Sequence, residues 1–362
     1  MLRAVADFAR SCVASPLNAA LSVVVLLLLY ATVPSFLEWA VLDAAWRGAT
    51  SADCPNKEAA CWVFIEARFG QIVYGTYPAP QRWRVDLALV GALIGIVLLL
   101  APRVPRKMLI GALLIALYAP VAAGLLAGGV FGLPRVATSA WGGLTLTLAV
   151  AAATIVASIP LGLLLALARR STMRVVRTLA IAFIELWRGV PLVVVLFMAV
   201  VMFPLFMPQG VELDTLLRTL IALALFNAAT MAEVFRGGFQ AIPASQYEAA
   251  DSLGLGRWRA LGLVVLPQVV RVAIPGLVNT CIAILKETTI VLIVGLVDVL
   301  AVIQAGASDP EWLAGEHIRA TGYLFVALVF WTICFGMSRY SARLERHLSR
   351  GSLQARSNRS AL

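Results

Sequence analysis

Long apolar runs constrain the fold of this chain more than any other feature. Of its 362 residues, 61% are hydrophobic and only 13% are charged. A soluble domain has no use for repeated uncharged runs of about 20 residues, whereas a bilayer core about 30 Å thick requires helices of that length. Helices also satisfy their own backbone polar groups inside lipid. The sequence therefore predicts an all-α polytopic membrane protein.

We predict about eight transmembrane helices from these runs. They are expected at about residues 16–39, 85–101, 108–128, 139–167, 178–206, 214–236, 272–298 and 320–340. The first run follows Arg3 and Arg10 and has no cleavage site of the small-residue type. We therefore expect a retained first helix rather than a removed signal peptide.

Basic residues predict the orientation of the spans, because loops rich in Lys and Arg stay in the cytoplasm. With the N-terminus in the cytoplasm, most of the 29 Lys and Arg residues fall on that side. An even number of spans then places both termini in the cytoplasm. The net charge of +10 could suggest nucleic acid, but the basic residues are scattered singly between apolar runs. This pattern favours the lipid bilayer, and no nucleic acid, as the partner.

The first three predicted spans differ from the other five because their apolar cores carry no charge. Gly91-x-x-x-Gly95 and Gly124-x-x-x-Gly128 offer small-residue faces for helix packing, although such spacings are common in apolar segments. We interpret residues 1–135 as an accessory membrane module with a periplasmic loop at about 43–84. That loop contains Cys54 and Cys61, and the sequence leaves open whether they form a disulfide.

Ionisable residues enter the later spans at helical spacing. Glu185 and Arg188 are three residues apart, and so are Glu233 and Arg236. Each pair could be neutralised locally near the membrane interface. Alternatively, the four side chains line the interior of the bundle or a solute path, where charged residues within membranes usually lie. The sequence leaves both interpretations open.

Lys286 is deeper in its predicted span than the other charged residues. It lies about fourteen residues into the span, hence about 21 Å along a helix, which is too far for easy access to the interface. Glu287 follows it but points about 100° away around the helix, so the two cannot simply pair. We predict that both residues belong to the translocation path or to a subunit interface.

A polar segment at residues 237–271 separates two of the spans. Ser245 and Glu248 have the spacing of a capping box that opens a short helix, and Gly254 or Gly256 is expected to end it. A second helix is expected to carry Trp258 and its apolar neighbours, and Pro267 to end it before the next span.

The first of these short helices has the features of a docking element. It combines the small residues Ala249 and Ala250 with the acidic Glu248, and it is expected to expose an apolar stripe of Tyr247, Ala250 and Leu253. Small side chains allow another protein to close around the helix, and a carboxylate can meet a basic rim.

The order Glu248-Ala249-Ala250, then Gly254, then Leu266-Pro267 resembles the signature loop, or EAA motif, of permease subunits of bacterial ATP-binding-cassette (ABC) importers. Segments at 141–146, 184–191, 232–238 and 285–289 are similar to the branch that transports polar amino acids. The segments at 70–75 and 82–84 resemble the longer permeases of general L-amino acid importers.

This resemblance implies a five-helix importer permease core at residues 136–345, behind three accessory helices and before a basic cytoplasmic tail at 346–362. In that family the loop is a coupling helix that docks into a separate ABC ATPase dimer. A periplasmic amino acid binding protein delivers the solute across the bacterial inner membrane, and a second related permease, in a heterodimer, completes the path. The residues that would couple to the ATPase are Glu248, Ala249, Ala250, Gly254 and Pro267.

No cofactor is expected on this chain, since ATP and Mg would be used by the partner ATPase. The three lysines, Lys57, Lys107 and Lys286, do not follow a glycine, so the phosphate loop of an ATPase is absent from the sequence. An ion-coupled secondary transporter of small polar solutes is the main alternative, although it leaves the cytoplasmic segment without a role. With two histidines and no HExxH or G-x-S-x-G motif, we expect no catalytic residue and no metal site.

Overall fold

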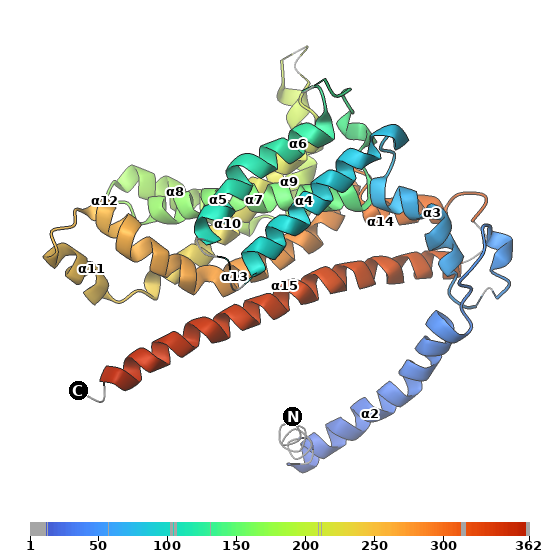
Figure 1. Ribbon diagram of the computed structural model, residues 1–362, viewed down its shortest axis with the longest axis horizontal. Helices are drawn as coiled ribbons and strands as arrows, with labels where there is room; N and C mark the ends of the chain where they lie inside the picture. The colour runs from blue at the N-terminus through green and yellow to red at the C-terminus, as the bar shows by residue number, and fades with distance from the viewer. Residues whose placement is uncertain are drawn as a thin grey trace. The chain divides into compact units, whose positions relative to one another are not determined.

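The computed structural model describes residues 12, 14–56, 58–101, 104, 107–130, 132–208, 210, 212–312 and 316–359. Arg3 and Arg10, which precede the first predicted span, lie outside them. Among the described residues the ordered elements are helices (Figure 1), and extended backbone pairing is limited to two isolated bridges. The prediction of an all-α fold is confirmed. The chain divides into two compact units, residues 1–69 with 303–325, and residues 70–302 with 326–362.

The first unit contains a long apolar helix and a loop closed by a disulfide. Helix α2 (Pro16–Leu37) begins with the Ser15 hydroxyl accepting a hydrogen bond from the Asn18 N–H, and it continues into a π-helical turn, Glu38–Leu42. Cys54 and Cys61 form a disulfide, with their Cα atoms 5.8 Å apart. The backbone N–H of Cys61 donates to the Thr321 hydroxyl at 3.0 Å. This hydrogen bond holds the disulfide against the start of the last helix.

An ion pair also holds this unit together. Arg68 lies in α3 (Trp62–Tyr74) and its guanidinium lies 2.7 Å from the Asp309 carboxylate. The pKa of Asp309 is lowered, first because its carboxylate accepts the backbone N–H of Glu311 and then because of Arg68. The last helix, α15 (Glu316–Arg359), begins in this unit and continues in the second.

The second unit holds most of the remaining helices. They are α4 (Arg82–Leu100), α5 (Lys107–Leu113), a π turn (Leu114–Tyr118), α6 (Ala119–Ala127), α7 (Gly143–Arg169), α8 (Arg174–Gly189), α9 (Leu192–Phe197) with its π and 3-10 continuation to Phe206, α10 (Thr215–Gln240), α11 (Ala244–Ser252), α12 (Arg257–Ala260), a π turn (Leu261–Val265), α13 (Leu266–Glu287), a 3-10 segment (Thr288–Val294) and α14 (Val299–Ala307), which runs into the first unit.

Within the described residues, six helices are long and apolar enough to cross a membrane, or up to seven if one bent pair forms a single span. The bounds of the six are Pro16–Leu42, Leu109–Ala127, Gly143–Arg169, Thr215–Gln240, Arg257–Val294 and His317–Arg346. The predicted span at about 85–101 corresponds to α4, a 19-residue helix whose first turns carry Arg82, Arg84 and Asp86.

The predicted span at about 178–206 is not one straight helix but a broken pair, α8 and α9 with its continuation. Helices α8 and α9 are bent by 103° relative to each other, and the break lies at Val190 and Pro191. Val190 has extended backbone angles, with φ −106° and ψ 136°. A residue before proline is driven out of the helical region by contact with the proline ring, and proline itself donates no backbone hydrogen bond.

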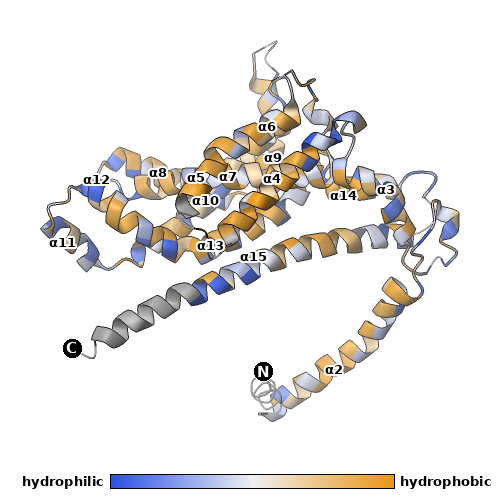
Figure 2. Ribbon diagram, viewed as in Figure 1, coloured by the Kyte–Doolittle hydropathy of each residue, from blue (hydrophilic) through white to orange (hydrophobic). Residues whose placement is uncertain are grey.

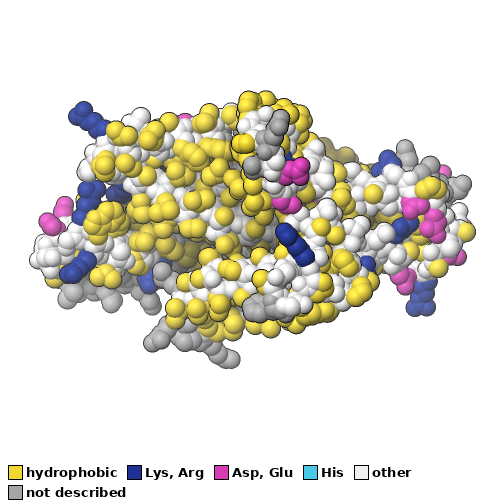
Figure 3. All heavy atoms as spheres, turned by 90° about the horizontal axis from the view of Figure 1, so that it is seen from above, with side chains coloured by type: hydrophobic (Ala, Val, Ile, Leu, Met, Phe, Trp, Pro, Cys, Tyr) yellow, Lys and Arg dark blue, Asp and Glu magenta, His cyan; other side chains and the backbone are white. Residues whose placement is uncertain are grey.

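Hydrophobic side chains cover much of the face in Figure 3, and charged side chains on it are few by comparison. Figure 2 shows that hydrophilic residues gather on α11 and α12, whereas α13 is mainly hydrophobic. Large exposed apolar side chains occur along α2 and α4, for example Leu26, Leu93 and Val97. An apolar surface of this kind matches lipid rather than water.

Glycines allow two close helix contacts in the second unit. A Cβ added to Gly91 or Gly95 of α4 would lie 2.7 Å from Tyr118 or Leu114, which belong to the neighbouring π turn. Gly128, by contrast, ends α6 with a φ of 69°. A Cβ on Gly162 of α7 would lie 2.4 Å from the Met231 Cβ and 3.0 Å from the Ala228 carbonyl oxygen of α10. Close approach of α7 to α10 therefore depends on Gly162.

We expect Gly162→Ala to destabilise the folded protein by about 1–3 kcal/mol, because the added methyl group meets backbone that cannot move away easily. Thermal unfolding in detergent, followed by size-exclusion chromatography, measures the effect. Gly336→Ala in α15 is the control, since no atom lies within 4 Å of its added Cβ. Equal unfolding midpoints for the two variants would contradict the packing role of Gly162.

Candidate functional site

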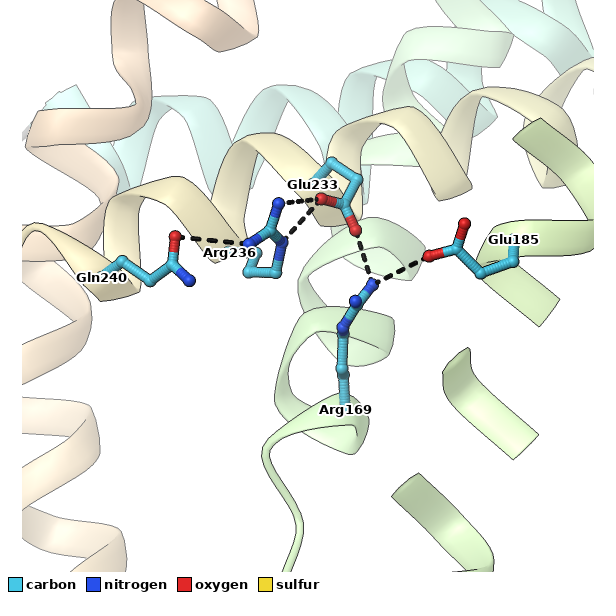
Figure 4. A network of polar contacts seen from close by, with 5 residues as sticks. All are labelled: Arg169, Glu185, Glu233, Arg236 and Gln240. Carbon is cyan, nitrogen blue, oxygen red and sulfur yellow. Dashed lines mark hydrogen bonds and ion pairs between the residues drawn. The ribbon is translucent and has the colours of Figure 1, made fainter. Parts of the chain in front are cut away.

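Four charged side chains meet where α7 ends. Arg169 is the last residue of α7, and its Nη1 lies 2.7 Å from Oε1 of Glu233 in α10 and 3.6 Å from Oε1 of Glu185 in α8. The second oxygen of Glu233 accepts from Arg236 at 2.6 Å, and Arg236 also donates to Gln240 at 3.3 Å. Figure 4 shows these five side chains converging from three helices. We call Arg169, Glu185, Glu233 and Arg236 the charge network.

The two carboxylates and two guanidiniums of the charge network balance one another. Glu233 is the most enclosed, with 14% of its side chain exposed, against 24% for Arg169 and 58% for Glu185. A carboxylate this enclosed needs opposite charge, because removing one partner of a buried pair leaves a costly unpaired charge. Glu233 has two cationic partners, so the α7–α10 contact is the firmer part of the network and the contact with Glu185 is the looser part.

The structure brings together three of the six residues predicted for the translocation path or an interface: Glu185, Glu233 and Arg236. Glu233 and Arg236 form the expected pair at i, i+3. Glu185 pairs with Arg169 rather than with Arg188, which is exposed on α8 outside the charge network.

Lys286 and Glu287 lie at a different place. Glu287 accepts a hydrogen bond at 3.2 Å from the amide of Asn227, a fully buried residue of α10. Asn227 precedes Glu233 by six residues, which is about 9 Å along a helix. Lys286, in the last turn of α13, is exposed on the surface of this chain. An exposed lysine within an apolar segment requires water or another subunit beside it.

The segment between α10 and α13 forms a short helix, α11, with a defined end. Gly254 has a φ of 71°, and its N–H donates to the Asp251 carbonyl while the Leu255 N–H donates to the Ala250 carbonyl. This is the Schellman arrangement, in which a left-handed residue follows the helix. Of the two glycines predicted to end the helix, Gly254 and Gly256, it is Gly254 that does so.

The predicted capping box is wrong. Pro243, not a serine, is the N-cap residue of α11, and no side chain caps this end. The extended angles of Pro243, φ −61° and ψ 147°, start the helix earlier than expected. Ser245 then lies inside the first turn, where its side chain cannot serve as the cap.

Pro267 does not end the helix that precedes it, contrary to the prediction. Helix α12 continues through the π turn Leu261–Val265 into α13, and Pro267 lies in the first turn of α13. The wider hydrogen-bond spacing of the π turn accommodates a residue that lacks an N–H. One helical stretch, Arg257–Val294, therefore joins the polar segment to the next span.

The apolar stripe predicted on α11 is only partly exposed. Ala250 is 2% exposed and Tyr247 is half-buried, whereas Leu253 is 79% exposed. Glu248 and Ala249 are also exposed. One face of α11 thus packs against the chain, and the opposite face is open.

A groove of about 690 Å³ lies beside α11. Its lining includes Arg170 and Met173 from the end of α7 and the loop that follows, Tyr247, Glu248 and Asp251 from α11, and Trp258 from α12. Trp258 is 80% exposed. The groove combines an exposed aromatic ring with charges of both signs, which is the composition of a protein-binding surface.

Residues 158–350 match the family described as "Binding-protein-dependent transport system inner membrane component". The chain belongs to this family of ABC importer permeases. It is 48% identical over 334 residues to the inner membrane amino-acid ABC transporter permease protein YhdY of Escherichia coli, an alignment that covers 92% of this chain and 90% of that protein. It is 36% identical over 400 residues to the glutamate/glutamine/aspartate/asparagine transport system permease protein BztC of Rhodobacter capsulatus, with 92% and 91% covered.

A solved structure described as an amino acid ABC transporter with histidines is 28% identical to this permease, with a TM-score of 0.50. The match covers 57% of this chain and 92% of the solved chain. The resemblance to the permeases of ABC importers for amino acids is therefore confirmed. Members of this family are multi-pass transport components of the inner membrane rather than enzymes.

Two arginines of the permease site were missed as functional candidates. Arg169 and Arg170 belong to the basic residues that predict the orientation of the spans, and the sequence predicted no other role for them. Arg169 lies in the charge network, and Arg170 donates to the hydroxyl of Tyr247 at 3.1 Å. Two consecutive arginines directly after an apolar span were the available signal, but the sequence holds no information on which acidic residue of another helix lies nearby.

Proposed function

We propose that this chain is the permease subunit that forms part of the translocation path for amino acid uptake across the bacterial inner membrane, with both termini in the cytoplasm. A separate ABC ATPase dimer, which uses ATP and Mg, drives the cycle, and a periplasmic amino acid binding protein delivers the solute. A second, related permease completes the path. Family membership and the names of the relatives support this proposal.

The observation that carries the coupling role is that α11 buries one face and exposes the other. Its Glu-Ala-Ala segment presents Glu248 and Ala249 outward, next to the exposed Leu253 and the groove, while Ala250 packs inward. Gly254 sets the end of α11, and Pro267 lies at the start of α13. In this proposal the outward face docks into the ATPase, with Glu248 meeting a basic rim.

The solute path is proposed to run past the charged residues of α13. Glu287 and Asn227 hold each other in place, and Lys286 is exposed on the same helix. In the assembled transporter Lys286 would face either the path or the partner permease. In both cases the permease core at 136–345 supplies these residues, and residues 1–135 act as an accessory module.

Replacing Glu248 with Lys should reduce co-purification of the ATPase in mild detergent about tenfold, because a like charge then faces the proposed basic rim. Glu345→Lys makes the same charge change at an exposed position of α15 and serves as the matched control. A normal ATPase yield with wild-type uptake for Glu248→Lys would refute the coupling role and favour an ion-coupled transporter.

Lys286→Met should lower solute uptake in proteoliposomes about tenfold while the protein still folds, because methionine keeps much of the length of the side chain and removes its charge. Uptake by the purified, reconstituted transporter measures this. If uptake and the yield of the assembled transporter are both unchanged, Lys286 has no role in the path or the interface.

A further inference from the structure

We propose that Arg169 and Arg170, the two residues at the end of α7, transmit the movement of α11 to the membrane-spanning helices. Arg170 holds α11, and Arg169 holds α8 and α10. This inference rests on the proposed function, in which α11 receives force from the ATPase, and it assigns the connection between α11 and the spans to particular side chains.

Arg170 fastens α11 to α7 and to the end of α10. Its Nη2 donates to the Tyr247 hydroxyl at 3.1 Å. The guanidinium also lies over two aromatic rings, 4.6 Å from the centroid of Phe239 and 5.8 Å from that of Tyr247. Phe239 is 2% exposed and belongs to the last turns of α10. A cation on a buried ring is a stronger contact than one on a solvated ring.

A second contact fastens α11 to the start of α13. The amide of Gln268 donates to the Gln246 side-chain oxygen at 3.0 Å and to the Val264 carbonyl at 2.9 Å. Ala250 is buried on the same inner side of α11. The inner face of α11 is therefore attached through neighbouring residues, Gln246 and Tyr247, to two different helices. A displacement of its open face must move the end of α7 or the start of α13.

Arg169 carries the displacement further because it is bonded covalently to Arg170. Its guanidinium lies between Glu233 of α10 and Glu185 of α8. A charge among apolar helices cannot be left unpaired at low cost. When the end of α7 moves, the helices that carry the two carboxylates must follow, or one ion pair must open.

The geometry indicates which pair opens. Glu233 is 2.7 Å from Arg169 and 14% exposed, whereas Glu185 is 3.6 Å away and 58% exposed. Water can replace Arg169 as a partner of Glu185 but not easily of Glu233. In addition, α8 ends at the 103° bend before α9, a break at which α8 can change its angle. The Arg169–Glu233 contact between α7 and α10 stays closed, and the Arg169–Glu185 contact between α7 and α8 opens. We call the Arg169–Glu185 contact the joint.

The test compares variants of the complete transporter, reconstituted with its ATPase and binding protein. Glu185→Gln removes the joint, Arg170→Gln removes the clamp on α11, and Tyr247→Phe removes only the hydroxyl from that clamp. Glu212→Gln and Arg174→Gln, at exposed positions of the same unit, are the matched controls. ATPase co-purification, ATP hydrolysis and solute uptake are measured on the same samples.

We expect Glu185→Gln and Arg170→Gln to lower the number of solutes taken up per ATP about tenfold, with Tyr247→Phe intermediate and ATPase co-purification within about twofold of wild type. Arg169→Gln combined with Glu185→Gln should be no worse than Arg169→Gln alone, because residues that act through one contact are not additive.

An unchanged ratio of uptake to ATP hydrolysis in Glu185→Gln and Arg170→Gln would overturn the inference. So would a loss of ATPase co-purification in Arg170→Gln equal to that of Glu248→Lys, since Arg170 would then act in docking. Failure of the proposed function is distinguishable, because in that case Glu248→Lys itself leaves ATPase co-purification unchanged.

Discussion

The structure depends on the rule that a charge among apolar helices must be paired. Arg169 ends α7 beside carboxylates of α8 and α10, and Glu233 takes a second guanidinium from its own helix. Glu233, which is 14% exposed, is acceptable only while its guanidinium partners are in place, whereas Glu185 is exposed enough for water to replace Arg169. The charge network therefore fixes the end of α7 against α10 and holds α8 by a looser contact.

The position of α11 gives this constraint a function. One face of α11 is attached to α7 and α13 through Tyr247 and Gln246, and the other face presents Glu248, Ala249 and Leu253 to the groove and to solvent. We propose that this face receives work from a separate ATPase. In the proposed account, the ATPase displaces the open face of α11, and Arg169 and Arg170 at the end of α7 transmit this displacement to α8 and α10.

Much of the fold followed from hydrophobicity and backbone chemistry. The apolar runs predicted an all-helical membrane protein, and the glycines at 254 and 256 predicted where α11 ends to within two residues, because length, apolarity and left-handed backbone act locally. The wrong predictions also came from local rules, and neighbouring residues overrode these rules. Ser245 is not the N-cap because α11 starts earlier, after Pro243. Pro267 does not end the helix because the π turn before it lets the helix continue into α13. The bend at Val190 and Pro191 was missed although Arg188, Gly189 and Pro191 interrupt the apolar run there.

The charge network was predictable only in part. The spacing of Glu233 and Arg236 is visible in the sequence because both lie on one helix. The pairing of Arg169 with Glu233 and Glu185 joins residues 64 and 16 positions apart on different helices, so it depends on the packing of α7 against α8 and α10. Close approach at Gly162 is part of that packing. No periodicity within a single segment contains this information.

The most direct test of the account is a pair of distances measured by electron paramagnetic resonance in the complete transporter. The three free cysteines, Cys12, Cys281 and Cys334, are first replaced by serine. Spin labels at Leu253 and Thr172 report on the attachment of α11 to the end of α7, and labels at Leu253 and Leu186 report on the joint with α8. All three positions are exposed.

The account predicts that ATP binding leaves the distance from 253 to 172 unchanged and alters the distance from 253 to 186. If ATP binding instead changes the distance between positions 253 and 172 and leaves the distance between 253 and 186 constant, α11 moves independently of α7. That result would contradict the central claim.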